Sequence, residues 1–215
     1  MRRAGAALGV LLLSGHAFAT EPIPSRAEHI PSPGRSIASD DSGEAIVLNP
    51  ANLGEARGAE LRWTGVRCPD TKKVGCGHAF SLSSPLIFGL STGLRVDYVT
   101  TPGGSEGVGF PYNGFDYTWI TWALAYKFSD KLSFGASIQR SYSPNSYTDG
   151  LFGITAGVTY RPYTRFAFSA VARDFNNPSP ELLPPRGEPV LDRSYALGLA
   201  FRPIGGVRKI GRAHV

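Results

Sequence analysis

The chain has 215 residues and a formal net charge of +5. Four of its basic residues, Arg2, Arg3, Lys209 and Arg212, lie in terminal segments that are set aside below, and 5 minus 4 leaves +1 for the remaining body. Because its lysines and arginines form no run longer than two residues, the basic balance does not indicate nucleic-acid binding. The body suits one domain, and its 26 glycines, 12 phenylalanines and 9 tyrosines favour strands over helices.

The first 19 residues predict a secretory signal peptide. Arg2 and Arg3 form a positive n-region, Ala6–Leu13 forms an apolar core, and Ala17-Phe18-Ala19 supplies small residues before a cleavage site. The alternative, a membrane anchor, needs roughly 20 apolar residues, and this run is shorter. We therefore expect export from the cytoplasm, with cleavage after Ala19.

The last residues of the chain, 209–215, break from everything before them, because they show neither a strand pattern nor turn residues. They read as a sequencing adapter translated in frame, so we expect the natural chain to continue past about Arg208. We therefore divide the chain into four predicted segments: a signal peptide over 1–19, an N-terminal segment over 20–57, an incomplete barrel over 58–208 and a non-native tail over 209–215.

The two cysteines, Cys68 and Cys76, flank a polar stretch. In an exported protein such a pair most often forms a disulfide that closes a small loop. A metal site that includes His78 is the alternative, but structural zinc usually takes four ligands and no second cysteine pair exists. We expect the disulfide, and neither a metal nor a cofactor.

From Glu60 onward, segments of about ten residues alternate in character and end at turn residues. In the segment 117–128, Ile120, Trp122 and Leu124 fall on one face, whereas Thr121 and Ala123 fall on the other. This period of two predicts a strand, because successive side chains of a strand point to opposite faces. The same pattern predicts eight strands: Glu60–Val66, His78–Ser84, Leu90–Tyr98, Tyr117–Phe128, Leu132–Ser141, Leu151–Tyr160, Phe166–Arg173 and 195–202.

The less apolar faces of these strands favour a membrane barrel over a soluble sandwich or lipocalin. They carry glycine, serine, threonine and single charges, whereas a solvated surface would carry denser lysine and glutamate. We expect the charged members to line the lumen: Arg95, Asp97, Lys127 and Arg173. Aromatic residues near strand ends fit the interfacial girdles of such barrels: Tyr98, Tyr126, Phe128, Tyr160, Phe166, Tyr195 and Phe201.

Connection lengths support the same fold. Short connections at 84–86, 129–131 and 162–164 alternate with long ones at 67–77, 100–116, 142–150 and 175–192. Outer-membrane barrels combine short periplasmic turns with long external loops, which places the Cys68–Cys76 loop outside the cell. The sequence thus predicts an all-β fold, a transmembrane antiparallel up-and-down barrel of at least eight strands in the bacterial outer membrane.

The segment before the barrel does not alternate. We expect a short helix within Ser36–Leu48, capped by Ser39, Asp40 or Asp41, followed by the motif Asn49-Pro50-Ala51. Residues 34–53, with Gly34-Arg35, Asp40-Asp41-Ser42 and this motif, resemble the start of the FadL-type outer-membrane transporters. Two features depart from that family: the strands are fewer, and the glycine-rich loop 100–116 is short beside the larger helical hydrophobic-capture region that the family's external loops usually hold.

The resemblance implies a function that the residues alone do not give. It implies that residues 20–57 plug the lumen as a hatch, with ligand or hatch roles for Asp40, Asp41, Asn49, Pro50 and Ala51. It further implies that the barrel carries long-chain fatty acids or aromatic hydrocarbons inward. The partners that follow are such a hydrophobic solute, outer-membrane lipid and the barrel-assembly machinery.

No catalytic motif supports an enzyme. The sequence contains no Gly-x-Ser-x-Gly elbow, no His-Glu-x-x-His and no phosphate-binding glycine loop. We expect no catalytic residue in this chain. Three functions stay open: a channel for hydrophobic solutes, a structural or assembly barrel, and the barrel module of a longer chain that carries a signal-peptide-peptidase-like protease domain.

Overall fold

The computed structural model describes residue 30 and residues 36–67, 76–100, 117–144, 149–163, 165–176 and 193–201. Within them, eight strands form one sheet in which each strand pairs antiparallel with its neighbours in sequence. The strands are β1 (Glu60–Val66), β2 (Cys76–Pro85), β3 (Leu90–Thr100), β4 (Tyr117–Ser129), β5 (Leu132–Tyr142), β6 (Phe152–Tyr163), β7 (Phe166–Arg173) and β8 (Ser194–Phe201). All eight predicted strands are confirmed, with ends that shift by three residues or fewer.

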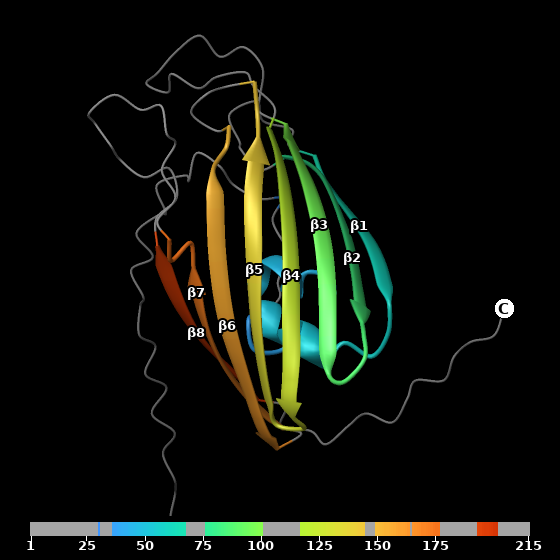
Figure 1. The fold of residues 1–215 in the computed structure, drawn as a ribbon, viewed down its shortest axis with the longest axis vertical. Coiled ribbons are helices and arrows are strands. Elements are labelled where there is room, and N and C mark those ends of the chain that lie inside the picture. Colours follow the sequence, from blue (N-terminus) through green and yellow to red (C-terminus); the bar gives the residue numbers. More distant parts are fainter. Residues whose placement is uncertain are drawn as a thin grey trace, which may run out of the picture.

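The sheet is strongly curved but open. Figure 1 shows the strands side by side around the short helices of the N-terminal segment, which lie behind β4 and β5. In the hydrogen-bonded order, β1 and β8 are the two edges and do not pair with each other. The up-and-down antiparallel arrangement is therefore confirmed, whereas the described strands do not close into a barrel.

Short and long connections alternate as predicted. The strands β2 and β3, β4 and β5, and β6 and β7 are joined by short turns, and the other connections are longer. We call the two ends of the sheet the short-turn end and the long-loop end; in Figure 1 they are the lower and the upper end. The first turn lies later than predicted, because Ser84 and Pro85 still pair with β3. Phe88 and Gly89 make this turn with φ angles of 55° and 77°, a region that glycine enters without strain.

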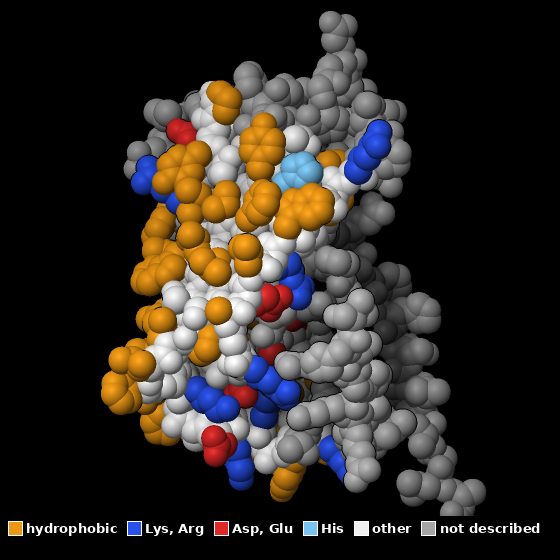
Figure 2. Space-filling view, turned by 90° about the vertical axis from the view of Figure 1, so that its right-hand side faces the viewer, with side chains coloured by type: hydrophobic (Ala, Val, Ile, Leu, Met, Phe, Trp, Pro, Cys, Tyr) orange, Lys and Arg blue, Asp and Glu red, His pale blue; other side chains and the backbone are white. Residues whose placement is uncertain are grey.

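The convex face of the sheet is apolar. On β4, Ile120, Trp122 and Leu124 are exposed on this face, as the alternation predicts. The predicted girdle residues are exposed as well: Tyr98, Tyr126, Phe128, Tyr160, Phe166, Tyr195 and Phe201. Figure 2 shows hydrophobic side chains spread over the upper and left parts of its view, with charged side chains gathered lower down.

The concave face is buried beneath the N-terminal segment. This segment contains the one-turn helix α1 (Ala45–Leu48) and the 3-10 helix η1 (Pro50–Glu55). Ile46 and Leu53 pack against Ala123 and Ala125 of β4 in one apolar cluster. A second cluster lies towards the long-loop end and consists of Ile30, Ala79, Val99, Tyr117, Trp119 and Leu151. Residues 36–56, which we call the plug, thus occupy the inside of the curve.

The helix of the plug is shorter than predicted. The capping position before α1 is Glu44, whose side chain makes no capping hydrogen bond, so Ser39, Asp40 and Asp41 do not cap it. Asp40 Oδ1 instead accepts from the Ser42 backbone N–H at 3.0 Å and from its hydroxyl at 2.6 Å. Such local side-chain contacts compete with helix formation, which explains the late start of α1. In the described part of the chain, no helix has the length and apolar character needed to cross a membrane.

Candidate functional site

The Asn-Pro-Ala motif lies on a floor of small residues. Ala125, Gly135 and Gly157 are cross-strand neighbours on β4, β5 and β6 and face the plug. A Cβ atom on Gly135 would overlap the backbone of Pro50 and Ala51. One on Gly157 would overlap the side-chain oxygen of Asn49. The absence of side chains at these positions therefore allows the plug backbone to approach the sheet closely.

Other inward glycines make room for apolar plug residues. A Cβ atom on Gly93 would lie 2.6 Å from Ile46 Cγ1, and one on Gly198 would lie 2.5 Å from Ile37 Cγ1. The strand alternation places these glycines on the inner face of the sheet, and the plug occupies the space in front of them.

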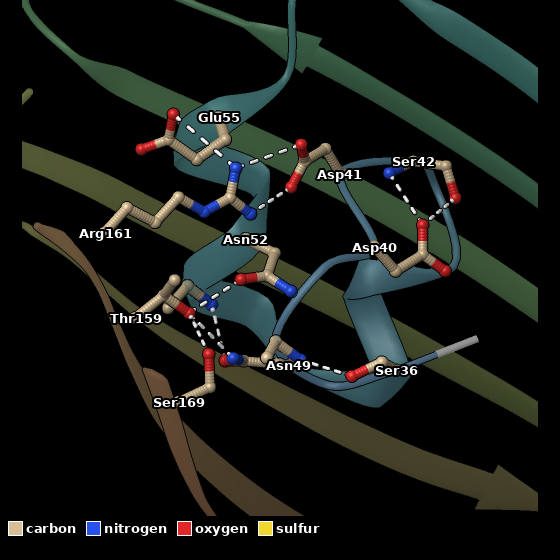
Figure 3. A network of polar contacts seen from close by, with 12 residues as sticks. Ser36, Asp40, Asp41, Ser42, Asn49, Asn52, Glu55, Thr159, Arg161 and Ser169 are labelled. Atoms are coloured by element: carbon tan, nitrogen blue, oxygen red, sulfur yellow. Dashed lines mark hydrogen bonds and ion pairs between the residues drawn. The ribbon is translucent and has the colours of Figure 1, made fainter. Parts of the chain in front are cut away.

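Asn49 and Asn52 connect the plug to the concave face of the sheet, which we call the wall, as Figure 3 shows. Asn49 caps η1, since its side-chain oxygen accepts from the Ala51 N–H at 3.2 Å, and Pro50 follows it as the first helical residue. The Asn49 amide donates to Thr159 Oγ1 and to the Ile37 carbonyl, both at 2.9 Å. Thr159 in turn donates to Asn52 Oδ1 at 2.6 Å. Asn49, Asn52 and Thr159 are buried, so the network fixes the position of the plug on β6.

Ion pairs hold the plug at the short-turn end. Arg161 of β6 pairs with Asp41 through both terminal nitrogens, one of them 3.0 Å from Oδ2 (Figure 3). Lys127 of β4 pairs with Glu55, with Nζ 3.1 Å from Oε2. Arg161 also lies 4.0 Å from the same Glu55 oxygen. Two plug carboxylates therefore meet two wall cations at this level.

A more deeply buried ion cluster lies nearer the long-loop end. Arg95 and Asp97 of β3 and Glu44 of the plug are at most 2% exposed. The Arg95 Nε atom lies 2.9 and 3.1 Å from the two Asp97 oxygens, and Nη2 lies 2.7 Å from Oδ1. Arg95 Nη1 pairs with Glu44, and Nη2 donates to the Ile30 carbonyl at 2.8 Å. One guanidinium thus binds the wall, the plug and residue 30.

All four predicted lumen residues lie on the concave face, and three of them contact the plug directly. Arg173 donates to the Leu48 carbonyl at 2.9 Å, at the end of α1, where a cation is favourable. Arg95 and Lys127 pair with plug carboxylates, and Asp97 is held through Arg95. Among the predicted hatch residues, Asp41 and Asn49 bind the wall by side chain, Pro50 and Ala51 lie on the glycine floor, and Asp40 shapes the preceding turn.

Sequence reasoning missed four contributors: Glu44, Asn52, Glu55 and Arg161. Arg161 lies two residues after Thr159, so continuing the alternation of β6 would have placed it on the inner face. No comparable signal exists for Glu44 and Glu55, because a carboxylate in a non-periodic segment does not reveal its partner.

The predicted disulfide and metal alternatives concern the long-loop end. Cys76, the first residue of β2, is disulfide-bonded and buried. Cys68, its predicted partner, lies outside the described residues, so the pairing stays a prediction. The described ranges contain no group of three or more histidine, cysteine, aspartate or glutamate residues that could hold a metal ion.

Comparison of the chain with known protein families, with curated proteins and with solved structures finds no match. The likeness of residues 34–53 to the FadL-type start therefore stays a resemblance.

Proposed function

We propose that this chain forms an outer-membrane β-barrel with a plugged lumen, and that it serves as a channel for hydrophobic solutes. The observation that carries the proposal is the inverted distribution of side chains across the sheet. Large apolar residues cover the convex face and are exposed, whereas charged and hydroxyl side chains lie buried between the sheet and the plug. A continuous exposed apolar surface of this kind marks a contact with lipid or with another apolar surface.

The height of the apolar face supports a bilayer over a protein partner. Outward positions on β4 run from Thr118 to Phe128, roughly 33 Å along the strand at about 3.3 Å per residue. A strand tilt of about 40° reduces this length to a band roughly 25 Å tall, the height of the apolar belt of outer-membrane barrels. Tyr98 and Tyr142 lie near the long-loop end of the band, whereas Tyr126 and Tyr160 lie near the short-turn end. Tyrosines at both edges match the interfaces of a membrane.

The plug itself argues for closure of the sheet into a wide ring. A barrel of about eight strands has an interior just large enough for its own side chains. Here α1 and η1 also lie inside the curve, so a closed ring needs additional strands. We propose that such strands pair with the free edges β1 and β8. Because β1 and β8 run antiparallel to each other, an even number of strands inserted between them keeps every neighbouring pair in the closed ring antiparallel.

Three observations favour a solute channel. The plug is held by hydrogen bonds and ion pairs that can be broken and reformed, and residues 34–53 resemble the hatch of fatty-acid transporters. In addition, an apolar cluster around Val99, Tyr117 and Trp119 lies between the buried ion cluster and the long-loop end. We propose long-chain fatty acids as the solute class, on the basis of the resemblance.

A structural barrel is the second candidate. Its supporting observation is that the inner face is polar and filled in the described residues, with buried charges such as Arg95 and Glu44 across the lumen. The two candidates differ in flux, because a structural barrel conducts no solute.

Uptake of a labelled long-chain fatty acid tests the channel in cells that lack their own transporter. Cells carrying this protein in the outer membrane should show saturable uptake, and deletion of residues 36–53 should abolish the saturable component. The variant Lys131→Gln, in an exposed short turn, serves as a control and should transport normally. Correct insertion without any uptake would support the structural barrel instead, and absence of the protein from the membrane fraction would refute both.

A further inference from the structure

Arg140 is an anomaly on the convex face. It lies on β5, is exposed, and has the cross-strand neighbours Ile120 on β4 and Phe152 on β6. Among the described strand residues, the other aspartates, glutamates, lysines and arginines lie on the concave side by the alternation of their strands: Glu60, Arg62, Arg95, Asp97, Lys127, Arg161 and Arg173. A cation in an otherwise apolar band calls for a specific partner, because an unpaired charge is costly beside lipid.

The side chain of Arg140 extends towards the long-loop end. Its guanidinium carbon lies 5.6 Å from the ring centre of Tyr142, the last residue of β5. Thr118 of β4 is the cross-strand partner of Tyr142, so a guanidinium and two hydroxyl-bearing residues share one corner of the outer face. The structure shows no ion pair between Arg140 and a carboxylate of the described residues.

The position of this corner suggests the identity of the partner. It lies at the upper edge of the apolar band, where the headgroups of a bilayer begin and where long basic side chains reach out of the lipid. A guanidinium binds phosphate through parallel charge-assisted hydrogen bonds, to which hydroxyl groups can add. We propose that Arg140, with Tyr142 and Thr118, binds the phosphate of an anionic lipid in the leaflet at the long-loop side. The inference rests on the proposed membrane location.

Lipid retention in nanodiscs tests the site. The full chain is placed in nanodiscs made of equal amounts of phosphatidylglycerol and phosphatidylcholine, then released and analysed by native mass spectrometry for the lipids that stay bound. Wild type should retain phosphatidylglycerol preferentially. Arg140→Gln should lower that preference about tenfold, the size expected for one lost charge-assisted contact, and Arg140→Lys should keep part of it. The control Arg165→Gln, an exposed arginine at the short-turn end, should behave as wild type.

Each other outcome has a definite meaning. Equal lipid preference in wild type and Arg140→Gln, with both proteins inserted, overturns the lipid site and leaves the proposed function standing. Displacement of the retained lipid by soluble glycerol phosphate would show that the site takes free phosphate groups, and would overturn the assignment to lipid. A chain that stays out of the nanodiscs in soluble, folded form overturns the proposed function and the lipid site together.

Discussion

Replacing Arg95 by methionine should lower the free energy of unfolding, measured by denaturant titration in detergent micelles, by about 3–5 kcal/mol. The substitution keeps much of the side-chain volume but removes the guanidinium that lies between Glu44 and Asp97. Both carboxylates are almost fully buried and would then lack this cation. Leaving a buried charge without its partner costs far more than the intact ion pair contributes.

Three further variants separate this effect from general damage. Arg62→Met removes a half-exposed pair with Glu60 and should cost less than about 1 kcal/mol. Arg95→Lys keeps the positive charge but loses the paired N–H donors of the guanidinium. Its free energy of unfolding should therefore lie between those of wild type and Arg95→Met. Adding Glu44→Gln to Arg95→Met should recover part of the lost unfolding free energy, because it removes one of the two carboxylates from which Arg95→Met takes the cation. Equal losses for Arg62→Met and Arg95→Met would show that the buried cluster does not hold the plug.

Replacing Gly135 by valine should detach the plug and destabilise the protein by about 3 kcal/mol or more. The new side chain would occupy the position of the Pro50–Ala51 backbone, which cannot rotate away as a side chain can. Valine itself suits a strand, so the sheet should still form. The measurement is thermolysin cleavage within residues 36–56, which we expect to become rapid in the variant and to stay slow in wild type.

Ala136→Val is the matched control for this experiment. Ala136 is the next residue on β5 and is exposed on the convex face, away from the plug. It ends with the same valine side chain, and its effect on stability should stay within about 0.5 kcal/mol. Protection of the plug in both variants would mean that the glycine floor does not position the Asn-Pro-Ala motif.

The sheet could be predicted from sequence because the determining signal is local. Each strand has to place apolar side chains on one face. In the sequence this appears as apolar residues at alternate positions, such as Ile120, Trp122 and Leu124. The signal also placed the lumen charges on the correct face, including Arg95 and Arg173. Strand ends depend less on this local signal: the sequence pattern predicts a turn at Pro85, although Pro85 still pairs with Ser91 at the end of β2.

The contacts of the plug could not be predicted in this way. Residues 36–56 lack a period, and their order comes from distant partners such as Thr159 and Arg161. Local propensity favoured a helix beginning near Ser39, but Asp40 binds Ser42 instead and delays its start. The inward glycines follow the strand alternation, yet only the folded arrangement shows which of them face plug residues, namely Gly93, Gly135, Gly157 and Gly198.

Tryptophan fluorescence in brominated lipid tests whether the convex face contacts lipid, because the chain has only 3 tryptophans. Trp122 is 49% exposed on the convex face, whereas Trp119 is 0% exposed on the concave face of the same strand. Variants that keep one tryptophan each, with phenylalanine at the other positions, report on the two faces separately. We predict strong quenching of Trp122 and little quenching of Trp119. Equal quenching of both, or quenching of neither, would contradict the assignment of the convex face to lipid.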